Sequence, residues 1–179
     1  KSEWDYFPWR EDEGELNSWK RGLTGQPIVD AGMREMYTTG RMHNRVRMIV
    51  ASYLTKHLLI DWRQGLKWFE ECLIDWDPAS NAMGWQWVAG SGPDASPFFR
   101  VFNPELQAKK FDPEGRYQMK YLGQSHLSND ESDKFYDMAP KSWNIDQKSR
   151  PSSSIVDLKF GRDRALNSYS KFKKIIADL

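Results

Sequence analysis

Apolar residues recur with helical spacing along most of this chain, and no segment shows the strict alternation that is typical of a half-buried strand. The clearest stripe lies between residues 41 and 59, where apolar residues follow the spacing i, i+3, i+4, i+7 and i+8. Its members are Val46, Ile49, Val50, Tyr53 and Leu54. This spacing places them on one buried face of a helix. The pattern therefore predicts an all-α fold.

Start and stop signals predict further helices. Proline follows a capping residue at Asp77-Pro78 and at Asn103-Pro104, and Asp157 can cap a last helix. The expected helices cover about 28–38, 41–59, 66–73, a stretch from Pro78, 104–111, the turns up to Leu122, and 158–178. Residues 62–65 are expected to form a turn.

The chain of 179 residues suits one domain. We divide it into a core (1–122), an irregular wrapping segment (123–154) that is polar and weakly periodic, and a docking helix (155–179). Parts of the wrapping segment are expected to be mobile. The first residue is Lys, so we expect that the chain was cut from a longer protein.

Composition excludes several classes of function. The net charge of +1 gives no general basic field, so any contact with nucleic acid must be a local patch. One cysteine, Cys72, fits a reducing compartment, and no apolar run approaches the ~20 residues of a membrane span. With no signal peptide in view, we expect a cytoplasmic protein. The three histidines (His43, His57 and His126) lack metal-ligand spacing, so we expect no metal site.

Nine tryptophans are the outlier in the composition, and by composition alone they favour a packed core over electron transfer. Asn44, Arg47 and Met48 share a helix face, which by spacing alone is slightly more typical of a solvated rim. Asn81 and Trp85 also share a face. There is no GxGxxG, GxxxxGK[ST], CxxC or HExxH motif and no recognisable catalytic triad, so a reaction would depend on a cofactor.

Four segments carry a resemblance to a known family. They read WKRGLTGQPIVDAGMREM, TGRMHNRVRMIVASYLTKHLLIDWRQG, LIDWDPASNAMGWQWVAGSGPDASPFFR and FNPELQAKKFDPEGRY. In order and spacing they resemble the flavin-binding helical domain of the photolyase/cryptochrome family, over roughly residues 9–122. The resemblance implies an all-α domain that binds FAD. It also implies that an N-terminal antenna domain, with its chromophore, and the first part of the flavin domain lie upstream and are absent here.

The resemblance assigns a role to each matching residue. The residues implied to contact FAD are Asp75, Trp76, Asp77, Asn81, Arg47 and Asn44, with Asn81 facing flavin N5. The implied electron-transfer relay is Trp85, Trp62 and Trp9, and with three matched positions we prefer the relay over simple packing. The residues implied to meet damaged DNA are Asn44, Arg45, Met48 and Trp87, with Arg100, Gln107 and Lys110 on the backbone-contact rim.

The resemblance is closest to class I cyclobutane pyrimidine dimer photolyases, which implies a monomer that acts on UV-damaged DNA. A cryptochrome without repair activity is the alternative, and a helical DNA-binding module without cofactor is a third. The His43-Asn44 pair, where (6-4) photolyases typically have two histidines, disfavours that subgroup. Arg41 stands at a position where photolyases of this group often have tryptophan. Because part of the flavin site is implied to lie upstream, we expect this chain alone to bind FAD weakly or not at all; sub-micromolar binding would contradict this.

Overall fold

Helices build the fold throughout the part of the chain that the computed structural model describes, which is residues 2–95, 97–98, 100–123 and 129–178. Within these ranges there is no strand, only an isolated parallel bridge between Arg10 and Ile60. The prediction of an all-α fold is confirmed. His126 lies outside the described residues. No helix in the described part is long and apolar enough to cross a membrane.

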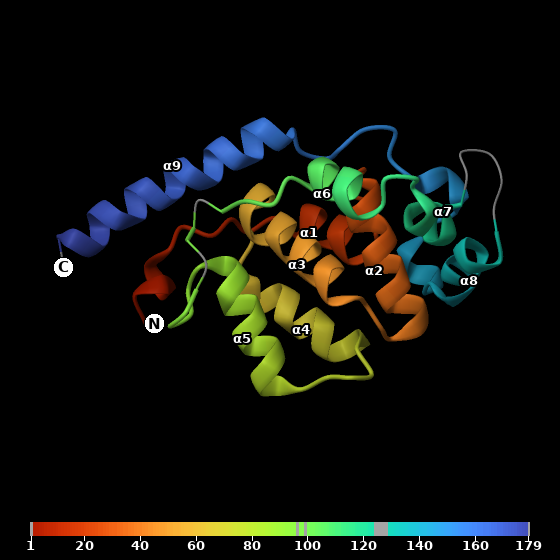
Figure 1. The fold of residues 1–179 in the computed structure, drawn as a ribbon, viewed down its shortest axis with the longest axis horizontal. Coiled ribbons are helices and arrows are strands. Elements are labelled where there is room, and N and C mark those ends of the chain that lie inside the picture. Colours follow the sequence, from red (N-terminus) through yellow and green to blue (C-terminus); the bar gives the residue numbers. More distant parts are fainter. Residues whose placement is uncertain (1, 96, 99, 124–128, 179) are drawn as a thin grey trace.

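The helices follow one another as shown in Figure 1. Their bounds are η1 (Ser2–Tyr6), α1 (Glu13–Lys20), α2 (Pro27–Thr39), α3 (Asn44–Ser52), η2 (Tyr53–His57), α4 (Trp62–Cys72), α5 (Pro78–Ala89), α6 (Pro104–Phe111), α7 (Arg116–Leu122), α8 (Asp130–Met138), η3 (Lys141–Trp143), η4 (Gln147–Ser149) and α9 (Leu158–Ala177).

The main core forms where α2 and α3 pack against α4 and α5. The whole stripe predicted from spacing is buried there, from Val46 at 8% exposure to Tyr53 and Leu54 at 0%. Gly32 permits the close approach of α2 and α3, since a Cβ at this position would collide with Val46. This packing fixes α3 and α5 relative to each other, and these two helices carry most of the expected site residues.

A second, aromatic cluster joins the two ends of the chain. Trp4 and Phe7 near the start pack against Phe98 and against Tyr169 and Phe172 of α9. Figure 1 shows α9 lying along one edge of the molecule, with both chain ends on the same side. The prediction that the last helix docks on the body is confirmed.

Three helix starts predicted from the sequence are confirmed by their caps. Asp77 accepts a hydrogen bond from the Ser80 N–H at 2.6 Å, Asn103 from Leu106 at 3.0 Å, and Asp157 from Phe160 at 2.7 Å. Each is the N-cap residue directly before its helix. The side-chain oxygen satisfies a backbone N–H that has no partner within the helix.

The helix predicted over 41–59 is wrong at both ends. It begins at Asn44, because the Nδ1 of His43 accepts the Arg45 N–H at 3.1 Å and caps the helix there. It then changes into a π-helix, η2, at Tyr53. All five residues of η2 are buried, although Thr55, Lys56 and His57 are polar, so polarity in the sequence gives no sign of this change.

The turn predicted over 62–65 is also wrong. Trp62 opens α4, and Asp61 caps it by accepting the Arg63 N–H at 2.9 Å. The short helix α1 was not predicted; it buries only Trp19 and so has almost no apolar stripe.

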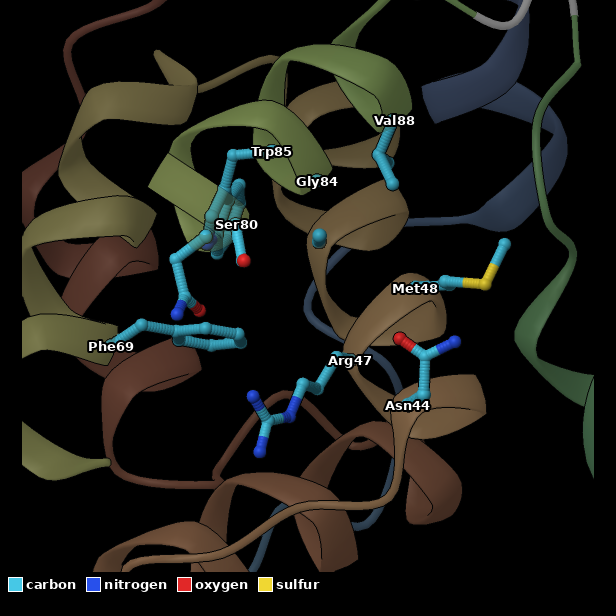
Figure 2. Close-up of a pocket in the computed structure, with 10 residues that line it drawn as sticks. Asn44, Arg47, Met48, Phe69, Ser80, Gly84, Trp85 and Val88 are labelled. Atoms are coloured by element: carbon cyan, nitrogen blue, oxygen red, sulfur yellow. The ribbon is translucent and has the colours of Figure 1, made fainter. Parts of the chain in front are cut away.

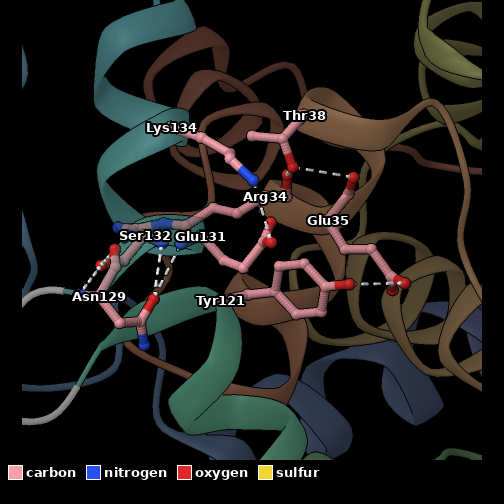
Figure 3. A network of polar contacts seen from close by, with 8 residues as sticks. All are labelled: Arg34, Glu35, Thr38, Tyr121, Asn129, Glu131, Ser132 and Lys134. Carbon is pink, nitrogen blue, oxygen red and sulfur yellow. Dashed lines mark hydrogen bonds and ion pairs between the residues drawn. The ribbon is translucent and has the colours of Figure 1, made fainter.

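The segment 123–154 was predicted to be irregular, and this is wrong for α8. Asn129 accepts the N–H groups of Glu131 and Ser132, while its own N–H donates to the Ser132 hydroxyl (Figure 3). This reciprocal capping box starts the helix. Phe135 of α8 then packs on the guanidinium of Arg34, at 4.7 Å, which anchors α8 to α2.

Candidate functional site

A cavity of about 170 Å³ opens between α3, α4 and α5. Its lining combines amides, one guanidinium and apolar or aromatic groups, as Figure 2 shows. The lining residues are Asn44, Arg47, Met48, Ala51, Phe69, Ser80, Asn81, Gly84, Trp85 and Val88. The structure thus brings together five residues that the sequence singled out, and all five come from α3 and α5. These two helices are separated by 25 residues of chain.

Arg47 is held in place on both sides of its guanidinium. Its Nε donates to the Met42 carbonyl at 2.7 Å, and its Nη2 donates to both carboxylate oxygens of Asp75 at 2.7 and 3.0 Å. Arg47 is thus paired with the acidic turn that precedes α5, which consists of Asp75, Trp76 and Asp77. Because Asp75 is 56% exposed, the pair adds at most ~1 kcal/mol to stability, and its main effect is to orient Arg47.

The acidic turn also organises the start of α5. Asp77 caps the helix, and the hydrogen bond from the Ser80 N–H lowers the pKa of the Asp77 carboxyl. Asn81 donates its side-chain N–H to the Asp77 carbonyl at 3.0 Å. This bond fixes the side chain of Asn81 at the cavity wall, one helical turn before Trp85. Trp76 is half-buried and packs on the main core.

Trp85 forms the aromatic wall of the cavity and is 2% exposed. Its ring meets Phe69 edge-on at 4.9 Å and Trp19 edge-on at 6.0 Å. Gly65 of α4 lies directly beneath the ring, where any Cβ would collide with it. Aromatic neighbours and a glycine therefore hold this ring in one orientation.

The other two tryptophans of the expected relay lie in the same part of the fold. Trp62 is buried in the main core, and Trp9 packs on that core and on Phe7, with ring centres 4.4 Å apart. The indole N–H groups of Trp9, Trp62 and Trp85 are buried, and none has a hydrogen-bond acceptor among the described residues. The exposure of the three side chains decreases from Trp9, which is half-buried, through Trp62 to Trp85, and the last two are buried.

The residues expected to meet DNA fall into two groups. Asn44 and Met48 line the cavity, while Trp87 is half-buried against the main core. Arg100 and Lys110 are exposed, and Gln107 is half-buried. Arg45 is half-buried at the start of α3, outside the cavity lining.

Several lining residues were missed from the sequence. Phe69, Ser80, Gly84 and Val88 complete the cavity wall. Phe69 looks like any core aromatic in the sequence, and Gly84 carries no side chain that could signal a ligand. Arg41 borders a second hollow of about 600 Å³, which Glu35, Arg47 and Asp75 also line. Among the described residues, no group of His, Cys, Asp and Glu side chains could hold a metal ion.

Comparison with known proteins gives consistent matches. The family described as "FAD binding domain of DNA photolyase" matches residues 1–171. A protein of Agrobacterium fabrum named deoxyribodipyrimidine photo-lyase is 52% identical over 95% of this chain and 36% of its own length. The Escherichia coli protein of that name is 52% identical over 66% of this chain and 25% of its own length. This chain therefore spans only about a quarter to a third of these relatives.

Solved structures agree with the sequence matches. A bacterial class III photolyase from Agrobacterium tumefaciens has a TM-score of 0.82 and 51% identity, over 97% of this chain and 37% of its own. A cryptochrome from Synechocystis has a TM-score of 0.74 and 39% identity, over 90% and 34%. An archaeal photolyase from Sulfolobus tokodaii, whose title mentions two FAD molecules, has a TM-score of 0.76 and 37% identity, over 94% and 37%.

Proposed function

The chain belongs to the family of FAD-binding domains of DNA photolyases, and on this premise we propose that its protein repairs UV-damaged DNA by light-driven splitting of cyclobutane pyrimidine dimers. The cavity between α3 and α5 is the main support for this proposal. Its lining contains both residues expected to contact the cofactor and residues expected to contact the DNA lesion.

The cavity fits part of an FAD molecule. Asn81 and Arg47 offer hydrogen-bond donors, and Phe69 and Trp85 offer a flat apolar surface, which together suit a heteroaromatic ring with polar edges. The volume of 170 Å³ is below the ~300–1,000 Å³ of pockets that enclose a drug-sized ligand. We infer that this chain supplies one side of the cofactor site. When bound, FAD would supply the light absorption and the electron that the repair needs.

The protein's own residues would position the reactants. Arg47 and Asn81, each fixed by hydrogen bonds, would orient the cofactor. Asn44 and Met48 would hold the lesion, since an extruded dimer needs an apolar wall and donors for its carbonyls. Trp87 would add to that wall, and Arg100, Gln107 and Lys110 would contact the DNA backbone without reading sequence.

Trp85, Trp62 and Trp9 would carry electrons inward from the surface to the cofactor. Their exposure decreases from the half-buried Trp9 to the buried Trp85, which suits a path from the surface to the cavity wall. Asp75, Trp76 and Asp77 would line the cofactor from the turn before α5. We place the antenna chromophore outside this chain, on the remainder of a protein as long as its relatives.

The test uses the protein in its full length with chemically reduced FAD. A single-stranded oligonucleotide that contains a thymine dimer is added, and the ultraviolet absorbance of thymine is followed under blue light. We expect light-dependent recovery of absorbance. No recovery with bound, photoreducible FAD would refute repair and favour the cryptochrome alternative, which the 39% identical Synechocystis structure represents.

A Trp9→Phe variant separates the relay from repair. We expect photoreduction of FAD to be slowed at least tenfold, because phenylalanine is much harder to oxidise, while chemically reduced enzyme repairs at the wild-type rate. Both are followed by absorbance in the same sample. Equal loss of both activities would contradict the division of roles, and Phe7→Leu, which changes a neighbouring ring outside the relay, is the matched control.

A further inference from the structure

An exposed aromatic residue lies beside one of the arginines assigned to DNA. Phe111 ends α6 and is 46% exposed. The guanidinium of Arg45, at the start of α3, lies 4.7 Å from the centre of its ring, and the ammonium of Lys110 lies 5.3 Å from it. These are cation–π distances. The contact joins two helices that are otherwise separated by more than 50 residues of chain.

The two neighbouring arginines of α3 are used in opposite ways. Arg47 donates to a carboxylate and a carbonyl, so its charge and most of its donors are committed inside the protein. Arg45 forms no ion pair with a carboxylate among the described residues. An aromatic ring orients a guanidinium through its face and leaves its N–H groups at the edge free for an anion.

The ring also lies beside a second cation. The Arg45 guanidinium and the Lys110 ammonium lie 4.7 and 5.3 Å from its centre, and Lys109 lies in the same last turn of α6. Positive charge therefore gathers around this ring on a chain whose net charge is only +1.

We propose that Phe111 is a positioning residue for DNA binding, which holds the Arg45 guanidinium ready to bind a backbone phosphate. This inference rests on the proposed function, because it needs DNA as the partner. Phe111 itself does not contact DNA in this proposal. It reduces the loss of side-chain freedom that Arg45 undergoes on binding, which is how preorganisation increases affinity.

The test measures the binding of a dimer-containing duplex to the full-length protein with FAD, by fluorescence anisotropy at several salt concentrations. We expect Phe111→Leu to weaken binding about two- to fivefold, the range of an exposed cation–π contact. Phe111→Tyr keeps the ring and should retain wild-type affinity. Phe160→Leu is the matched control, since Phe160 of α9 is an exposed ring with its own arginine, Arg164, at 5.2 Å.

A double-mutant cycle identifies the residue through which Phe111 acts. In an Arg45→Ala background, Phe111→Leu should have no further effect on affinity. Arg45→Ala should reduce the slope of log K against log salt by about 0.9, whereas Phe111→Leu should leave the slope close to wild type. Retained FAD absorbance and an unchanged melting temperature show that each variant is folded.

Three outcomes would overturn the inference: wild-type affinity in Phe111→Leu, an equal loss in both backgrounds, or a loss in Phe111→Tyr as large as in Phe111→Leu. Failure of the proposed function looks different. In that case the wild-type protein itself would show no preference for dimer-containing DNA over undamaged DNA.

Discussion

Replacing Gly65 by alanine tests how tightly the fold holds the Trp85 ring. Gly65 lies in the first turn of α4, where an added Cβ would collide with Cη2 of Trp85. It would also lie 2.6 Å from Cζ3 of Trp85 and 2.7 Å from Cδ2 of Leu54. Ordinary carbon–carbon contacts are about 3.5–4.0 Å, so the ring must move.

Two opposing terms set the size of the effect. Alanine is favoured over glycine inside a helix by about 0.5–1 kcal/mol. Overpacking a filled core costs about 1–3 kcal/mol, and the upper end applies here because Phe69 and Trp19 block the ring's retreat. We therefore expect Gly65→Ala to lower the free energy of unfolding by about 2–2.5 kcal/mol.

Urea unfolding of the full-length protein, followed by tryptophan fluorescence, measures this difference. Gly14→Ala in α1 is the matched control, since the nearest atom to its Cβ would be Oδ1 of Asp12 at an ordinary 3.4 Å. Because this position has no clash, we expect the control to be as stable as wild type or more stable by up to about 1 kcal/mol, which is the helix preference of alanine alone. A Gly65→Ala protein as stable as wild type, with unchanged fluorescence, would show that the Trp85 ring is not fixed by this contact.

Two further variants test a buried and a half-buried polar group, Lys56 and Glu35, by the same unfolding assay. Lys56 is fully buried over the Phe98 ring, with one hydrogen bond to the Ala89 carbonyl at 3.1 Å, and burial places its pKa well below 10.5. Between that lowered pKa and 10.5 the unfolded chain binds more protons than the folded one, so wild-type stability falls as pH falls. Lys56→Met should remove this pH dependence and raise stability at pH 7; an unchanged pH dependence would contradict the burial argument. Glu35 accepts hydrogen bonds from Tyr117 at 2.5 Å and Tyr121 at 3.3 Å (Figure 3 shows the second). Glu35→Gln should cost about 1–2 kcal/mol by weakening the contact of α2 with α7, and an effect below 0.5 kcal/mol would show that these bonds are replaced by water.

The parts of the fold that could be predicted are those in which residues close together in the sequence determine the local structure. The starts of α5, α6 and α9 follow from Asp77, Asn103 and Asp157, because a capping side chain and the helix that it caps are neighbours in sequence. The π-helix at Tyr53 could not be predicted. Its residues are all buried, and because tertiary packing buries the polar Thr55, Lys56 and His57 too, polarity in the sequence does not indicate exposure there.

The site was predictable for a different reason. Spacing alone placed Asn44, Arg47 and Met48 on one face and slightly favoured a solvated rim, whereas in the structure they line one cavity. Their roles came from the resemblance to photolyases and cryptochromes, and these roles remain predictions. Phe69 and the Arg45–Phe111 contact could not be predicted, because each depends on the packing of helices that are distant in sequence.

The aromatic cluster that joins the chain ends has a consequence for folding during synthesis. Trp4 and Phe7 are made roughly 170 residues before Phe172. At about 5–20 residues per second, the early rings wait roughly ten to thirty seconds for this partner. Until Phe172 arrives, the side of these rings that α9 covers in the folded domain has no apolar partner from that helix. Closing this cluster is a contact of high sequence separation, so α9 is expected to dock late, as the step that seals the domain.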